Sequence, residues 1–111
     1  MRNTPPQTFG QAVAKARMKT GRGLREVAPL ILKEDGEPIS FQYLSDIEND
    51  RRNPPSDHMI DQLASVLGVS RYYLYIHARR IPPDFPVKVD AKEADKVYEK
   101  LREMLEKSLA A

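Results

Sequence analysis

Polar and cationic side chains gather in the middle of this sequence, in an order that suits contact with a nucleic acid. From position 40 the chain reads S-F-Q-Y-L-S-D-I-E-N-D-R-R-N-P-P. Ser40 is a favoured helix N-cap, and Leu44 and Ile47 have the spacing of a buried helical face. The opposite face is mostly uncharged and is followed by two arginines. It carries Phe41, Gln42, Ser45, Asp46 and Asn49.

Such a face suits a helix that enters a DNA groove while the next loop binds phosphate. The Gln42 amide can pair bidentately with adenine, and the Phe41 ring can pack on a thymine methyl or belong to a core or dimer contact. Asp46 can accept from cytosine, or it can repel phosphate and exclude wrong sites. Arg51 and Arg52 are either phosphate ligands or solvated loop residues. The alternative for the whole stretch is a surface helix with polar neighbours.

Other site chemistry cannot be assembled from these residues. Cysteine is absent, and His58 and His77 have no acidic residue at ligand spacing. No nucleophile–base arrangement, paired carboxylate pocket or glycine-rich phosphate loop is recognisable. We therefore expect a protein that is not an enzyme and uses no metal or cofactor.

Length and charge indicate one small domain with an appendage. The chain has 111 residues and a net charge of +2, and residues 1–25 hold six basic and no acidic side chains. Residues 1–81 carry net +3 and residues 82–111 net −1. A basic first half suits contact with a polyanion. No signal segment or membrane-length apolar run is present, so we expect a soluble cytoplasmic protein without membrane contact.

Apolar periodicity predicts helices at about 9–19, 24–31, 41–49, 57–67, 71–78 and 91–109, and no strand. Pro29 should kink the second helix, and residues 33–38 form an acidic turn. We divide the chain into an unstructured arm (1–7), a helical domain (8–80), a proline-rich linker (81–90) and a C-terminal helix (91–111).

The C-terminal helix carries an apolar stripe that needs a partner surface. Its central residues are Val97, Leu101, Met104 and Leu105. Because the proline-rich linker separates them from a core that looks complete, we expect them to pair with a second subunit. Packing on the chain's own domain and capture of another protein are the alternatives.

Several segments together resemble the phage-repressor helix-turn-helix family, also called the Cro or XRE type. The resemblance covers residues 8–78, and its most specific parts are L-R-E-V-A at 24–28, Y-L-S-D-I-E-N-D-R-R-N-P at 43–54 and I-D-Q-L-A-S-V-L-G-V-S at 60–70. It implies an all-α, five-helix lambda-repressor-like domain in which residues 41–49 form the recognition helix. The C-terminal helix lies outside the resemblance.

The resemblance also implies roles for single residues. The base-reading positions are Ser40, Phe41, Gln42 and Asp46, and Ser45 shares their face. The phosphate-binding positions are Arg22, Arg25, Asn49, Arg51 and Asn53, beside Arg52. A buried ion pair should join Arg17 and Glu48, and the spacing of each residue from buried neighbours independently places it at the edge of the core.

The sequence departs from the family pattern in three places. About six extra residues lengthen the turn around 33–38, Pro29 interrupts the second helix, and Asp50 stands where glycine is usual. Asp50 should adopt a left-handed backbone, which Asp tolerates better than most residues. The first two departures bear on how the second helix meets the DNA backbone.

These observations together predict a sequence-specific regulator of transcription that binds double-stranded DNA, as a homodimeric repressor on a two-fold-related operator. One alternative is an antitoxin-type autorepressor whose C-terminal helix binds a toxin. The other is a protein-interaction adaptor that keeps the fold without binding DNA.

Overall fold

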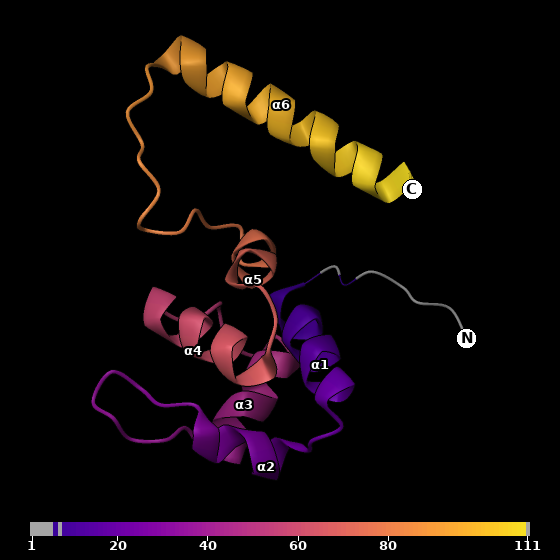
Figure 1. Cartoon of the computed structure of the whole chain (residues 1–111), viewed down its shortest axis with the longest axis vertical. Coiled ribbons are helices and arrows are strands. Elements are labelled where there is room, and N and C mark those ends of the chain that lie inside the picture. Colours follow the sequence, from indigo (N-terminus) through magenta and orange to yellow (C-terminus); the bar gives the residue numbers. More distant parts are fainter. Residues whose placement is uncertain (1–5, 7, 111) are drawn as a thin grey trace.

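The computed structural model describes residue 6 and residues 8–110. Most of the arm predicted for residues 1–7, and the last residue, lie outside the described residues. The described part contains six α-helices, one 3₁₀ segment and no β-strand. Five short helices form a compact body, and α6 stands apart from it at the end of an extended segment (Figure 1).

The first helices follow the predicted caps. α1 (Phe9–Thr20) begins where the Thr8 hydroxyl accepts from the Gln11 N–H, and it ends at Gly21 with φ of 74°. α2 (Leu24–Val27) lasts only about one turn before Pro29 converts the chain to the 3₁₀ segment η1 (Ala28–Leu30). This confirms the irregular second helix, because proline removes a backbone donor. Ala28, the residue before Pro29, nevertheless keeps helical dihedrals, with φ of −51° and ψ of −45°.

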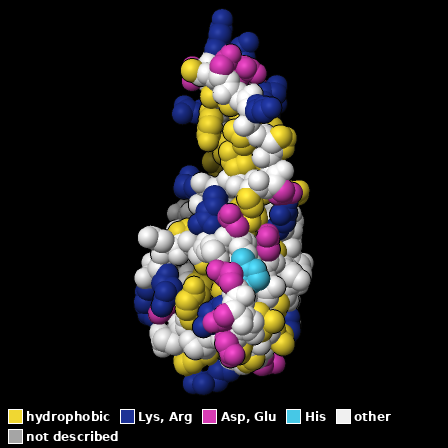
Figure 2. Space-filling model, turned by 90° about the vertical axis from the view of Figure 1, so that its left-hand side faces the viewer, with side chains coloured by type: hydrophobic (Ala, Val, Ile, Leu, Met, Phe, Trp, Pro, Cys, Tyr) yellow, Lys and Arg dark blue, Asp and Glu magenta, His cyan; other side chains and the backbone are white. Residues whose placement is uncertain are grey.

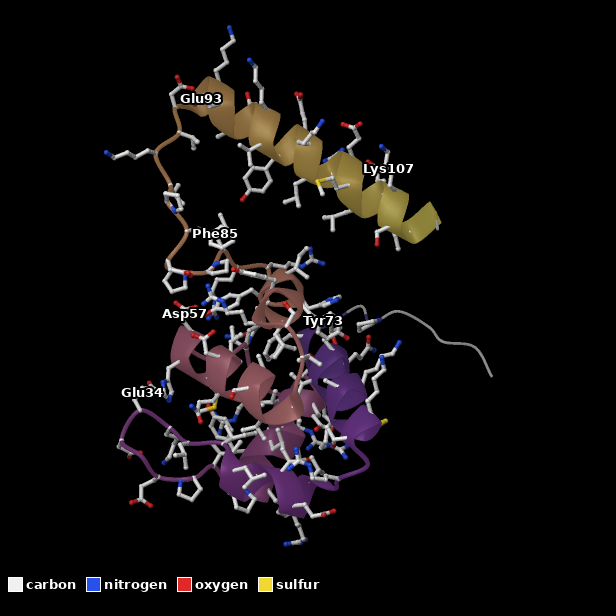
Figure 3. All side chains as sticks on the ribbon, viewed as in Figure 1. Glu34, Asp57, Tyr73, Phe85, Glu93 and Lys107 are labelled. Atoms are coloured by element: carbon white, nitrogen blue, oxygen red, sulfur yellow. The ribbon has the colours of Figure 1, made fainter. Side chains whose placement is uncertain are left out.

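The lengthened turn is an ordered loop. An isolated antiparallel bridge joins Leu32 to Pro38, and the Ile39 N–H donates to the Ile31 carbonyl at 3.0 Å. The Leu32 N–H donates to Gln62 Oε1 of α4 at 3.1 Å, so the base of the loop is fixed to the body. The loop extends to one side of the helical body (Figure 3), and Glu34 stays near the start of α4, where the Ser56 hydroxyl donates to Glu34 Oε1 at 3.5 Å.

α3 (Phe41–Glu48), α4 (Asp57–Leu67) and α5 (Arg71–His77) complete the body. Their apolar faces enclose one core with α1 and η1. Burial of Leu44 and Ile47 confirms the buried face predicted for residues 41–49, and in α4 Leu63 is buried while Val66 is half-buried. The largest fully buried side chains are Tyr75, Ile31, Leu44, Ile60, Leu63, Leu74, Val13 and Val27.

The beginning of the predicted linker is held on α5. Arg71 Nη2 donates to both carboxylate oxygens of Asp84 at 2.6 and 2.7 Å. The rings of Tyr72 and Phe85 meet edge to face with centroids 5.7 Å apart. Figure 3 shows Phe85 lying over α5. Only residues 86–89 are left as an extended, exposed connection to α6.

α6 (Ala91–Ala110) begins with the predicted capping box, in which the Glu93 N–H donates to Asp90 Oδ1 at 2.8 Å. Its side chains from 91 to 109 are exposed, apart from half-buried Ala94. Hydrophobic side chains therefore remain open on the narrow upper lobe of the molecule (Figure 2). Among the described residues, no helix has the length and apolar character that crossing a membrane requires.

Candidate nucleic-acid interface

α3 presents a polar face because its apolar positions are fully used by the core. The Ser40 hydroxyl caps the helix by accepting from the Tyr43 N–H at 3.0 Å. Leu44 and Ile47 are buried, and this burial turns Gln42 and Asp46 toward the other side. The orientation of this polar face is thus set by the packing of Leu44 and Ile47 in the core.

The Asp46 carboxylate contacts three other side chains on this face. Its Oδ1 accepts from Gln42 Nε2 at 3.0 Å and from Arg51 Nη1 at 3.3 Å. Its Oδ2 lies 3.9 Å from Arg52 Nε. The Asp46 side chain is 22% exposed, against 61% for Arg51 and 50% for Arg52. The arginines therefore remain open to a second anion while they contact this carboxylate.

Two contacts between an arginine and an aromatic ring lie beside this face. The Arg25 guanidinium lies 4.1 Å from the centre of the Phe41 ring, and the Arg52 guanidinium lies 4.3 Å from that of Tyr43. Both rings are partly buried and pack against the core. Stacking of this kind orders a planar cation while leaving its N–H groups available. Phe41 therefore serves the core and the placement of Arg25, whatever it contacts outside.

Asn49 joins the end of α3 to the loop of residues 50–55, which contains Arg51 and Arg52 and which we call the arginine loop. Asn49 Nδ2 donates to the Ser45 carbonyl at 2.8 Å and lies 3.4 Å from the Ser45 hydroxyl. The Asn49 amide is thus folded back on α3, and Ser45 is partly covered. Asn53 is exposed in the following loop.

Asp50 joins the end of α3 to the start of α1. Its φ of 56° confirms the left-handed backbone predicted for this position. Its carboxylate accepts from the Thr8 hydroxyl at 2.6 Å and from the Gly10 N–H at 2.9 Å. An anion at a helix N-terminus is favoured by the orphan N–H groups and the helix dipole. Asp50 therefore has a structural use that glycine would lack.

Glycine at position 10 makes that junction possible. A Cβ there would lie 2.5 Å from the Ile47 carbonyl oxygen and 2.7 Å from that of Glu48. The first turn of α1 thus touches the last turn of α3 through backbone alone. This contact sets where α3 stops and where the arginine loop starts.

Arg17 and Glu48 form a bidentate ion pair below the junction. Arg17 Nε and Nη2 donate to the two Glu48 oxygens at 2.6 and 2.9 Å, and Nη1 donates to the Arg22 carbonyl at 3.0 Å. The side chains are only 14% and 7% exposed. The hydrogen bond to Glu48 raises the pKa of the Arg17 guanidinium against the opposing effect of burial.

Arg22 has a different position from the other cations of the predicted site. Its Nη2 donates to the Val66 carbonyl near the end of α4 at 3.0 Å. This bond satisfies one of the orphan carbonyls at a helix C-terminus. The bond uses one of the five guanidinium N–H groups and holds the Arg22 side chain at the end of α4.

Arg80 supports the arginine loop from below. Its Nη1 donates to the Pro55 carbonyl at 2.7 Å and to Asp57 Oδ1 at 3.1 Å, and its Nη2 donates to the Pro54 carbonyl at 3.2 Å. The loop between α3 and α4 is therefore tied to the end of α5. Nothing in the local sequence signals this contact, because the partners are separated by about a quarter of the chain.

The structure thus brings one group of the predicted residues together around α3 and leaves others aside. The gathered residues are Arg25, Phe41, Gln42, Ser45, Asp46, Asn49, Arg51 and Arg52. The predicted dimerisation residues lie on α6, outside the body, and their exposed fractions are 53% for Val97, 37% for Leu101, 64% for Met104 and 42% for Leu105. Thr8 was predicted as the cap of the first helix but not as a partner of Asp50, and sequence reasoning missed Gly10, Tyr43 and Arg80. Only Gly10 carried a signal, since a glycine in a first helical turn suggests a close backbone approach.

Comparison with known proteins supports a helix-turn-helix in the middle of the chain. A helix-turn-helix family model matches residues 32–74, which include α3, α4 and the first half of α5. No curated protein and no solved structure matches the chain. The family that this model describes consists of DNA-binding regulatory domains, so the match suggests that this segment belongs to a DNA-binding regulator of transcription.

Proposed function

We propose that the chain is a sequence-specific repressor of the phage-repressor type, which binds double-stranded DNA as a homodimer. The observation that carries this proposal is the open face of α3, on which Gln42 lies beside Arg51 and Arg52. An amide can read a base edge in the major groove, and exposed guanidinium groups can hold phosphate. Contacts of Glu48 and Asp50 with α1 hold the C-terminal end of α3, and Arg80 holds the loop that follows, which supports a defined placement of that face.

We expect replacement of both Arg51 and Arg52 by glutamine to weaken binding to all duplexes by similar factors. The reason is that phosphate contacts carry no base information. The slope of log K against log salt should flatten by roughly one unit for each lost contact. Fluorescence anisotropy over a salt series on a selected duplex and on a random duplex measures both effects.

The double variant Lys88→Gln with Lys92→Gln is the matched control for this salt series. It removes the same charge from exposed positions in the linker and α6. An unchanged slope in the arginine variant would remove those residues from the interface.

Dimerisation is the second part of the proposal, and α6 supports it. Most of the stability of a helix in a protein comes from packing of its apolar face, so the apolar stripe of α6 needs a covering surface. The body does not supply one, because that stripe is exposed from Val97 to Leu109. A second copy of α6 would cover it and would bring two recognition helices onto one operator.

We expect deletion of residues 87–111 to leave a folded monomer that binds one half-site weakly. The full chain should sediment as a dimer and prefer half-sites about one helical turn, ~34 Å, apart. Analytical ultracentrifugation and band shifts on paired half-sites measure this. A full chain that stays monomeric at high micromolar concentration, with a truncated chain that unfolds, would assign α6 to the body instead.

The exposed face of α6 also favours a second candidate function, an antitoxin-type autorepressor that captures another protein through α6. Reproducible copurification of one chain that depends on residues 91–110, with the isolated protein remaining monomeric, would favour this candidate over the homodimer.

A further inference from the structure

Three side chains of the candidate interface contact a single carboxylate, that of Asp46. Gln42 reaches it from the preceding turn of α3, and Arg51 and Arg52 reach it from the loop. We propose that Asp46 is a positioning residue that sets base specificity. It orients the Gln42 amide for pairing with adenine, and its negative charge weakens phosphate binding on every DNA sequence. This inference rests on the proposed DNA binding and deepens it.

The chemistry of a carboxylate fixes which way the Gln42 amide faces. A carboxylate only accepts, so the group 3.0 Å from Asp46 Oδ1 must be the amide nitrogen. One N–H of Gln42 is thereby used. The remaining N–H and Oε1 stand side by side as one donor and one acceptor.

That remaining edge matches adenine. Adenine offers an acceptor at N7 and a donor at N6, whereas guanine offers two acceptors in the same place. A freely rotating amide could turn to meet other patterns, but an amide held by Asp46 meets guanine with one repulsive contact. Asp46 thus narrows the choice of base without touching DNA.

The charge of Asp46 acts on all duplexes alike. Its carboxylate, together with Arg51 and Arg52, gives a local net charge of +1 rather than +2. Exposed ion pairs are weak, so phosphate can displace the arginines from Asp46. The carboxylate then remains beside the DNA backbone and lowers the affinity for every sequence. Only a site that also engages Gln42 compensates for that loss.

Direct reading of cytosine by Asp46 fits the geometry less well. Oδ1 already accepts from two donors, and the side chain is only 22% exposed. A base amino group would have to displace Gln42 or Arg51 from that oxygen, or reach Oδ2 beside the Arg52 guanidinium. The contacts therefore favour positioning over direct readout.

Two substitutions in the full chain separate orientation from charge. Asp46→Asn keeps an acceptor oxygen for Gln42 and removes the charge, whereas Asp46→Ala removes both. On an alternating dG–dC duplex, which contains no adenine, both variants should bind about three- to tenfold more tightly than the natural chain. Their salt slopes should steepen by up to about one unit. Glu99→Gln, with the same charge change on exposed α6, should leave both quantities unchanged.

Base preference is measured by selection from a random duplex pool. The natural chain should enrich adenine at one position of each half-site, and Asp46→Asn should keep only part of that enrichment, because an amide at position 46 can donate as well as accept and fixes the Gln42 amide less strictly. Asp46→Ala should lose most of it. Gln42→Ala should lose the same preference while its salt slope stays unchanged. Near-UV circular dichroism verifies that each variant is folded.

The outcomes distinguish this inference from the proposed function. If the natural chain binds no duplex in a salt-dependent way, the proposed function fails and the role of Asp46 fails with it. If the natural chain binds steeply but the Asp46 variants match it in slope and base preference, only the role of Asp46 is overturned. Loss of all binding in folded Asp46 variants also overturns it, because Asp46 would then be a direct ligand. Should the alanine variant be unfolded, the asparagine and Gln42 variants still decide the charge and orientation effects.

Discussion

Replacing Arg17 with methionine is expected to lower the free energy of unfolding by about 3–5 kcal/mol. The cause is the Glu48 carboxylate, which is 7% exposed and would lose two charge-assisted hydrogen bonds. The Arg22 carbonyl would lose its donor as well. Small domains are stable by about 5–15 kcal/mol in total, so this change would bring the body close to unfolding.

Chemical denaturation followed by near-UV circular dichroism of the tyrosines measures this loss. Tyr75 is buried and reports on the core, and burial raises its pKa to about 12. Asp84→Asn is the control, because it breaks an ion pair whose carboxylate is 63% exposed and should change stability far less. In a double-mutant cycle with Glu48→Leu, the two losses should not add, since the second removes the orphaned charge. Additive losses would show that the pair contributes no coupling.

The Gly10→Ala variant should be less stable than the natural chain by about 1–3 kcal/mol. Helix propensity alone predicts the opposite, because alanine in a helix is favoured over glycine by roughly 0.5–1 kcal/mol. The new Cβ would meet two backbone oxygens of α3 at 2.5 and 2.7 Å, and backbone cannot move aside as a flexible side chain can. Overlap with α3 therefore decides the sign.

The same substitution should weaken sequence-specific DNA binding, because it pushes the end of α3 and Asp50 away from α1. Thermal unfolding and anisotropy on a selected duplex measure the two effects. Ser65→Ala, at an exposed position of α4, provides a matched change to alanine and should leave both unaffected. A Gly10→Ala protein that is more stable than the natural chain would show that α1 and α3 separate without cost.

Local sequence signals predicted the helices well, because caps and apolar spacing act within a few residues. Ser40, Ser56 and Ser70 each cap a helix as their positions indicated. Pro29 shortened α2 for the reason that any proline would. The left-handed backbone of Asp50 followed from the family pattern and the tolerance of Asp for positive φ.

The arrangement of the site depended on contacts that no local pattern reveals. Arg80 binds the carbonyls of Pro54 and Pro55, and a backbone acceptor leaves no trace in side-chain identity. The contacts of Asp46 with Arg51 and Arg52 depend on how the loop folds back after Asp50. The lengthened turn was predicted as a loop, yet its attachment to Gln62 of α4 came only from the tertiary structure.

The contacts of Asp84 and Phe85 with α5 limit the length of the free connection to α6, and this length affects which operator spacings two joined chains can reach. These contacts leave residues 86–89 as the tether between the helical body and α6, and this tether reaches at most about 14 Å when fully extended. In two chains joined through α6, each body could swing on its own tether. Two half-sites whose spacing differs from a full helical turn by a few base pairs face different sides of the duplex. The second body could then reach its half-site by moving on its tether, without any twisting of the DNA. Removal of the Asp84 carboxylate would lengthen the tether and widen the range of half-site spacings that one protein accepts.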